Sequence, residues 1–171
     1  PLSSDKTALN AAIDTIVASG STAGQIGIAW GWYMLSPNFG LWTGSSVPAA
    51  YNTEHLKKVA ILMTDGEFNT TYCNGVISRD STAGSSSDRI NCNATNGSPY
   101  TQSQTLCNAM KAQGIIVYTV AFELSSATAV QNLMTNCATS PSYRYDAAND
   151  AELQSVFQAI AQDLKTLRLS R

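Results

Sequence analysis

The apolar positions of the chain fall into short stretches separated by polar segments. Val59–Met63 is an apolar run without alternation, which is typical of a strand buried on both faces in a parallel sheet. A second run at 115–121 and a short strand at 143–146 follow it. Apolar residues spaced three and four apart predict helices at 104–113, at about 127–137 and after 150. This order predicts an α/β fold, a Rossmann-like three-layer sandwich whose sheet is mainly parallel.

Amphipathic helices are expected at both ends of the chain. At the start, a Ser-Ser-Asp capping cluster precedes a predicted helix over 6–18, whose apolar positions are Leu9, Ile13, Ile16 and Val17. At the end, Asn149 and Asp150 cap the clearest amphipathic pattern of the sequence. Its apolar face consists of Leu153, Val156, Phe157, Ile160, Leu164 and Leu167.

A further helix is predicted just before Pro37. Its apolar face is expected to contain Ile26, Ala29, Trp30, Tyr33 and Met34. We interpret Trp30 and Tyr33 as core residues rather than as a ligand-binding aromatic box. Gly and Pro interrupt the segment 36–56 that follows, which is expected to be irregular. Exposure of Trp32 or Trp42 would indicate a contact surface.

Composition and charge restrict the classes of function. The 171 residues fit one domain spanning 1–171, and a long polar loop at about 69–103 interrupts it. The net charge is −2 without a basic run, so binding to nucleic acid is not expected. Only 13% of the residues are charged, with Ser, Thr, Asn and Gln in their place, as is common in exported proteins. The sequence contains no run long enough to span a membrane and no visible signal peptide, and its start at Pro1 leaves room for upstream residues.

The four cysteines favour disulfides over a metal site. Cys73, Cys92, Cys107 and Cys137 form no Cys-x-x-Cys pair, and the single histidine, His55, lies at no ligand spacing from them. An even number of widely spaced cysteines fits two disulfides in an oxidising compartment, with three connectivities allowed. Four free thiols in a cytosolic protein are the alternative.

The residues after the first predicted strand carry the candidate chemistry. Asp65 follows the strand directly, and the carboxyl ends of parallel strands are where open α/β sheets bind ligands. A carboxylate there is suited to hold a hard cation through oxygen. The alternative is that Thr64-Asp65-Gly66 forms only a turn or helix cap. A hydrolase using Asp65 and Glu67 as an acid/base pair is a further alternative, although both lie in the turn and no Ser/His/Asp set or phosphate-binding loop accompanies them.

Two sequence runs resemble a known family. Residues 59–67 (Val-Ala-Ile-Leu-Met-Thr-Asp-Gly-Glu) and 109–122 (Ala-Met-Lys-Ala-Gln-Gly-Ile-Ile-Val-Tyr-Thr-Val-Ala-Phe) resemble a von Willebrand factor A (VWA) domain. Shorter matches are similar to the carboxyl-terminal part of TadG-like proteins of bacterial tight-adherence (Flp) pilus systems, namely 27–37, 136–138, 145–147 and 167–171. The resemblance covers nearly all of the chain except 70–103. It implies a membrane-anchored module on the periplasmic or cell-surface side of a bacterial envelope that binds a protein partner and is not an enzyme.

The resemblance also implies a metal-ion-dependent adhesion site, of which Thr22 and Asp65 match two ligands. The Asp-x-Ser-x-Ser motif of that site does not occur in the chain, and the family places it upstream of Pro1. Binding of Mg²⁺ or Ca²⁺ is therefore expected only where that segment is present, and a structural scaffold with a vestigial metal site is the alternative. The chain resembles a partial domain without its first strands.

Two structural expectations follow from the same resemblance. Strand 59–64 is expected to have an open edge and an exposed apolar face, which predicts poor solubility or self-association of the chain. Related sequences with a short loop imply that Cys107 pairs with Cys137, which leaves Cys73 to pair with Cys92.

Overall fold

The computed structural model describes residues 3–17, 22–70, 96–124 and 127–169. Within them it contains five α-helices, two short 3₁₀ helices and one three-stranded sheet. The helices are α1 (Lys6–Asp14), α2 (Gly24–Leu35), α5 (Pro99–Ala112), α6 (Thr128–Cys137) and α7 (Asp150–Leu169). The strands are β1 (Val59–Thr64), β2 (Ile116–Phe122) and β3 (Arg144–Ala147), and the 3₁₀ helices are η1 (Gly44–Ser46) and η2 (Pro141–Tyr143). The α/β fold and the positions of the three strands are as predicted.

The sheet has the order β1-β2-β3, with β2 in the centre. Both pairs of strands are parallel, and the register places Val59 beside Ile116 and Thr119 beside Arg144. Each connection between successive strands contains a helix, α5 or α6, as parallel pairing requires. All three strands therefore end at the same edge of the sheet, where Asp65 follows β1.

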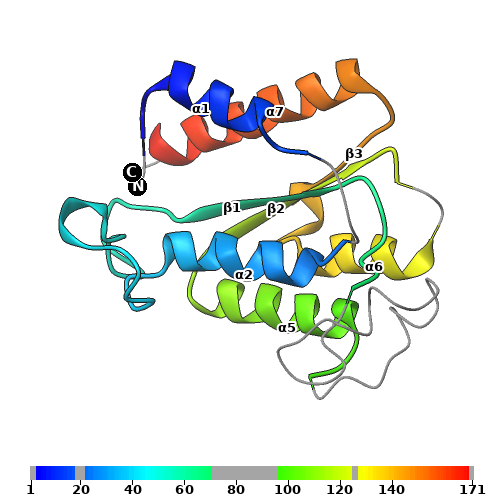
Figure 1. The fold of residues 1–171 in the computed structure, drawn as a ribbon, viewed down its shortest axis with the longest axis horizontal. Helices are drawn as coiled ribbons and strands as arrows, with labels where there is room; N and C mark the ends of the chain where they lie inside the picture. The colour runs from blue at the N-terminus through cyan, green and yellow to red at the C-terminus, as the bar shows by residue number, and fades with distance from the viewer. Residues whose placement is uncertain (1–2, 18–21, 71–95, 125–126, 170–171) are drawn as a thin grey trace.

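Helices cover the two faces of the sheet unequally. Figure 1 shows α1 and α7 on one side and α2, α5 and α6 on the other. On the α7 side, Tyr118, Val120 and Ala147 of the sheet pack with Val156 and Ile160 of α7. On the opposite side, one core cluster joins residues of α2, α5, α6 and β2, namely Ile28, Cys107, Met110, Val117, Leu133 and Cys137, with Ile115 and Phe68. The chain thus forms the three layers that the sequence predicts.

The first strand is less buried than its apolar sequence predicts. Ile61 and Met63 are 42% and 44% exposed, because α7 packs over β2 and β3 and no described helix covers the outer part of β1 on that side. No described strand pairs with the outer edge of β1. Among the described residues, β1 therefore has the open edge and the exposed apolar row that were expected of strand 59–64.

Helix α1 differs from its prediction in length. It ends at Asp14 rather than near residue 18, and Asp5 caps its start by accepting from the N–H groups of Thr7 and Ala8. None of its residues is buried, and the apolar residues of the predicted pattern are exposed: Leu9 43%, Ile13 61%, Ile16 74% and Val17 81%. The amphipathic pattern is present, but it does not lead to burial of any residue of the helix.

The predicted core face of α2 was wrong. The buried residues are Gln25 and Ile28, and Trp32 and Leu35 pack partly against the core. Trp30 and Met34, predicted to be inward, are 49% and 45% exposed. The helix is apolar on nearly every side, so the spacing alone does not select a face. Trp32 and Trp42 are half-buried, and their indole N–H groups donate to Tyr51 (2.9 Å) and to the carbonyl of Tyr33 (3.0 Å).

One boundary and one predicted core position of the later helices differ from the sequence prediction. Helix α5 begins at Pro99 rather than Gln104, because the hydroxyl of Ser98 accepts the N–H of Thr101 and caps it. Helix α6 begins at Thr128, close to the predicted start, and Ala127 precedes it without a side-chain cap. Phe157 of α7 is 42% exposed rather than inward. Among the helices that the structure describes, none is long and apolar enough to cross a membrane.

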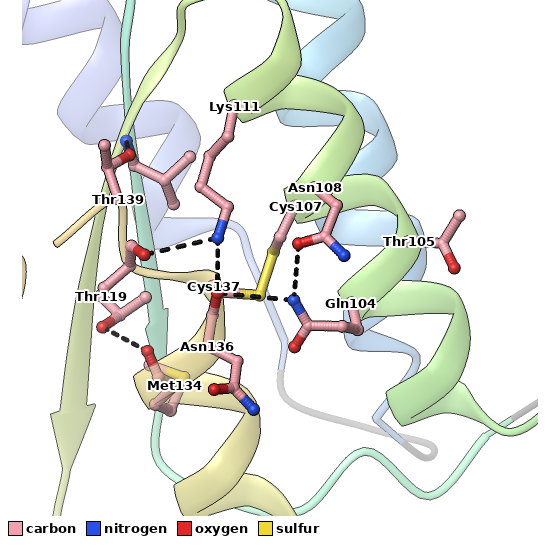
Figure 2. Close-up of a disulfide and its surroundings, with 12 residues drawn as sticks. Gln104, Thr105, Cys107, Asn108, Lys111, Thr119, Met134, Asn136, Cys137 and Thr139 are labelled. Atoms are coloured by element: carbon pink, nitrogen blue, oxygen red, sulfur yellow. Dashed lines mark hydrogen bonds between the residues drawn. A yellow bond between two sulfur atoms is a disulfide. The ribbon is translucent and has the colours of Figure 1, made fainter. Parts of the chain in front are cut away.

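One disulfide lies inside the core. Cys107 of α5 is bonded to Cys137 at the end of α6, and the two residues are 1% and 0% exposed. Figure 2 shows Lys111 and Gln104 of α5 beside this bond, both donating to the carbonyl of Asn136 (2.6 and 3.4 Å). The pairing implied by the resemblance is confirmed for this pair. Cys73 and Cys92 lie outside the described residues, so their pairing stays a prediction.

Candidate functional site

The candidate site begins at the carboxyl end of β1. Thr64 is buried, and its hydroxyl group donates to the carbonyl of Gly66 (3.0 Å) and accepts from the N–H of the same residue (3.3 Å). This local turn holds the backbone on both sides of Asp65, whose side chain is exposed. The carboxylate of Asp65 is therefore free to contact a ligand at the edge where all three strands end.

The loop before α2 is fastened to the segment that follows this turn. The N–H groups of Asn69 and Thr70 both donate to the carbonyl of Thr22 (3.0 Å each). In return, the N–H of Thr22 donates to the side-chain oxygen of Asn69 (2.8 Å). These bonds hold Thr22 against the segment that follows β1 and Asp65. They use the main chain of Thr22, and its exposed hydroxyl group makes no hydrogen bond within the described residues.

The start of α2 is packed tightly against the same segment. Phe68 is 2% exposed and lies so close to Gly24 that a Cβ atom there would collide with its ring. The ring of Phe68 also stacks on that of Tyr100, with centroids 6.0 Å apart. Burial, followed by the Glu67 carboxylate, raises the pKa of the Tyr100 phenol. Gly24 thus permits the close approach that places Thr22 beside the strand end.

Gln25 adds a buried polar group to this region. It is 3% exposed, and its amide nitrogen donates to the carbonyl of Thr70 (2.7 Å). Its side-chain oxygen is buried and has no partner among the described residues. A buried oxygen without a donor is costly unless something outside these residues pairs with it. The sequence pattern gave no signal for this residue, because a single Gln in an apolar helix has no characteristic spacing.

The donors assembled here do not by themselves fit a magnesium ion. Thr22 and Asp65 supply two oxygen ligands, whereas Mg²⁺ requires six in near-octahedral geometry. The described residues contain no group of three or more His, Cys, Asp or Glu side chains that could hold a metal ion. The two predicted ligands therefore form at most one side of a metal site.

The two carboxylates of the hydrolase alternative lie away from the histidine of the chain. Asp65 and Glu67 are both exposed at the carboxyl end of β1. His55 precedes β1, so it lies toward the opposite end of the strand, where its imidazole is 3.3 Å from the carboxylate of Glu54. The described residues thus offer this alternative no catalytic set.

A cavity lies at the amino end of the sheet, away from the candidate site. It has a volume of about 460 Å³ and is lined by 52–58 and by Gln113 and Gly114. Lys58 borders it, but its ammonium group donates to the carbonyl of Leu35 (2.5 Å) and lies 5.3 Å from the centre of the Tyr51 ring. Burial lowers the pKa of Lys58. This lysine holds the end of α2 against β1 and is a structural residue that sequence analysis did not identify.

Comparisons with known proteins support the fold through structure alone. Neither the family models nor the curated proteins that we compared with this sequence gave a match. Among solved structures, the chain is similar to the pilus adhesin SpaC from Lactobacillus rhamnosus GG, with a TM-score of 0.60 and 19% identity. It is also similar to proximal thread matrix protein 1 (PTMP1) from the mussel byssus, with a TM-score of 0.51 and 17% identity. A structure of PTMP1 with a zinc-occupied MIDAS motif matches with a TM-score of 0.50.

These likenesses define the fold as a VWA-like α/β sandwich. The matches cover 92% of this chain for the adhesin and 91% for the byssus protein, so nearly the whole chain takes part. The chain spans only 20% and 28% of the length of those two proteins. At identities this low the similarity establishes the fold and not the activity.

Proposed function

We propose that the chain is part of a non-enzymatic, VWA-type binding or assembly module that engages a protein partner at the carboxyl end of β1. The observation that carries this proposal is the pair of main-chain bonds that fasten Thr22 to Asn69 and Thr70, in the segment that follows Asp65 along the chain. Two exposed oxygen-bearing side chains are thereby held at the edge of the sheet where α/β folds bind ligands. The solved neighbours include an adhesin and a byssus matrix protein, which favours adhesion or assembly over catalysis.

In its finer form, the proposal includes a metal ion and a bacterial setting. Thr22 and Asp65 would be two ligands of Mg²⁺ or Ca²⁺, and an upstream Asp-x-Ser-x-Ser segment would supply the others. A carboxylate of the partner would complete the coordination shell. The zinc-occupied MIDAS motif of a neighbour supports such a site in proteins of this fold. The pilus system, the membrane anchor upstream of the chain and the periplasmic or cell-surface location rest on the resemblance to TadG-like proteins.

The metal hypothesis is tested on a form of the protein that carries the upstream segment. If its coding sequence contains Asp-x-Ser-x-Ser, millimolar Mg²⁺ or Mn²⁺ should raise its melting temperature, because an ion that binds only the folded state stabilises it. At about 100 times the dissociation constant, the gain is about 2.7 kcal/mol. Differential scanning calorimetry with and without EDTA measures the effect.

Two matched variants distinguish a specific site from general ion effects. Asp65→Ala should abolish the metal-dependent shift, whereas Glu67→Ala, which removes an exposed carboxylate two residues away, should retain it. An unchanged shift in Asp65→Ala would contradict the proposed ligand. The absence of any shift in the unmodified protein would instead favour a structural scaffold with a vestigial site, which the incomplete set of donors in the described residues also fits.

A further inference from the structure

Helix α1 is short and lacks the packing that usually stabilises a helix of its length. It has nine residues, none of them buried, and an isolated helix of this length is marginal in water. Most of the stability of such a helix has to come from packing of its apolar side. Leu9 and Ile13 are nevertheless 43% and 61% exposed. The helix therefore either unfolds or finds an apolar surface to cover.

A matching apolar surface lies on the same side of the sheet. Val59 packs against the cluster beneath α7, and because side chains alternate along a strand, Ile61 and Met63 point to this side as well. Figure 1 shows α1 together with α7 on this side. Ile61 and Met63 are 42% and 44% exposed, since α7 packs over β2 and β3. The outer part of β1 thus lacks the helical cover that the rest of the sheet has.

The two surfaces also have the same spacing. Leu9 and Ile13 are four residues apart on a helix, which corresponds to about 6 Å. Ile61 and Met63 are two residues apart on a strand, which corresponds to about 6.6 Å. The apolar pair of α1 can therefore lie over the apolar pair of β1 without distortion of either element. Neither pair contains a charged residue, so no charge would be buried by the contact.

We propose that α1 is a strap that closes over β1, placing Leu9 and Ile13 on Ile61 and Met63. The occupant of the exposed row is therefore a segment of this chain. Thr22 itself is held to Asn69 and Thr70 by main-chain bonds, so closure leaves the candidate site in place. This inference does not depend on metal binding or on the identity of a partner.

Hydrogen exchange of the α1 amides tests the proposal on the 171-residue chain. A helix that stays exposed should exchange at nearly the rate of an unfolded peptide, whereas a docked helix is protected. We expect protection of the α1 amides of at least about tenfold, which corresponds to about 1.4 kcal/mol. Exchange at the unfolded rate in the unmodified chain would overturn the proposal.

Matched variants show whether β1 is the docking surface. Ile61→Ser combined with Met63→Ser should remove the protection of α1 and leave that of α5 unchanged, and Ile13→Ser should do the same. Ala11→Ser, on the opposite side of α1, is the control for loss of helix propensity and should keep the protection. Protection that persists in the Ile61→Ser/Met63→Ser protein would show that α1 docks elsewhere, for instance on a second copy, and would overturn the assignment.

Discussion

Single buried polar groups set several features of this molecule. The ammonium group of Lys58 caps the carboxyl end of α2 through the carbonyl of Leu35, so a residue that flanks a strand also fixes a helix. Tyr118 differs from Lys58 because its hydroxyl group has no hydrogen-bond partner in the described residues. It is fully buried, and the centre of its ring lies 4.4 Å from that of Tyr143. Burial, and then its neighbours Tyr143, Asp163 and Tyr145, raise the pKa of Tyr118 to about 12.

The raised pKa of Tyr118 predicts a loss of stability at high pH. The unfolded chain releases this proton near pH 10, whereas the folded protein holds it up to about pH 12. The contribution of Tyr118 to the free energy of unfolding is therefore fully present below pH 10. It is lost as the pH rises toward 12, which lowers the free energy of unfolding by on the order of 2 kcal/mol. Denaturant unfolding of the unmodified protein and of Tyr118→Phe at pH 8 and pH 11 measures the difference. The variant should lose less stability between the two pH values; an equal loss would contradict the assignment to Tyr118.

At the scale of elements, a disulfide links α5 and α6 covalently. It closes a segment with a sequence separation of 30 residues, and such a closure stabilises a fold by about 3–4 kcal/mol in the chain-entropy model. We expect the double variant Cys107→Ala/Cys137→Ala to lose at least this much, because two buried side chains are also shortened. Chemical denaturation at equilibrium measures the loss. Asn108→Ala, an exposed change on the same helix, should cost less than about 1 kcal/mol.

The elements that the sequence predicted well are those with an unambiguous pattern. The strands predicted at 59–64, 115–121 and 143–146 lie within about one residue of β1, β2 and β3. The first two were found as apolar runs, because buried parallel strands have few polar positions. The face of α2 was not predictable, since its apolar residues surround the helix. The early start of α5 depends on one hydrogen bond of Ser98, which has no apolar pattern.

The candidate site was predictable only in part for a similar reason. Asp65 follows from its place after a strand, but the loop of Thr22 is held by main-chain bonds to Asn69 and Thr70, and main-chain contacts leave no pattern in a sequence. The contribution of Gln25 and the role of Gly24 beneath Phe68 likewise depend on packing between distant segments. Ligand roles for Thr22 and Asp65 remain predictions that rest on the resemblance.

For the whole molecule, the open edge of β1 predicts self-association. The N–H of Ile116 donates to the carbonyl of Lys58, which fixes how β1 bonds to β2. In this register Ala60 and Leu62 bond to β2 through their main chain. The N–H and C=O groups of Val59, Ile61 and Met63 therefore point outward. Such an unpaired edge is a template for pairing with other chains. We expect light scattering to detect oligomers that grow with protein concentration.

A proline substitution at the centre of this edge distinguishes association through backbone hydrogen bonds from association through apolar side chains. Ile61→Pro removes an outward N–H group without removing a bond to β2, so it should reduce the oligomers. Ile61→Ala shortens the side chain but keeps the N–H group, so it should retain most of them. Equal effects of the two changes would show that the association depends on the side chain, and a strictly monomeric unmodified chain would contradict the prediction.

Burial of the disulfide in the core also determines how fast it can be reduced. Both sulfur atoms lie in the core, with Cys107 and Cys137 exposed by only 1% and 0%, so a reducing agent can reach them only after α5 and α6 separate. At high reductant concentration, the rate of thiol release would then depend on how often the two helices open rather than on the strength of the reductant. A protein that meets reducing conditions for a short time would keep this bond for as long as its core stays closed.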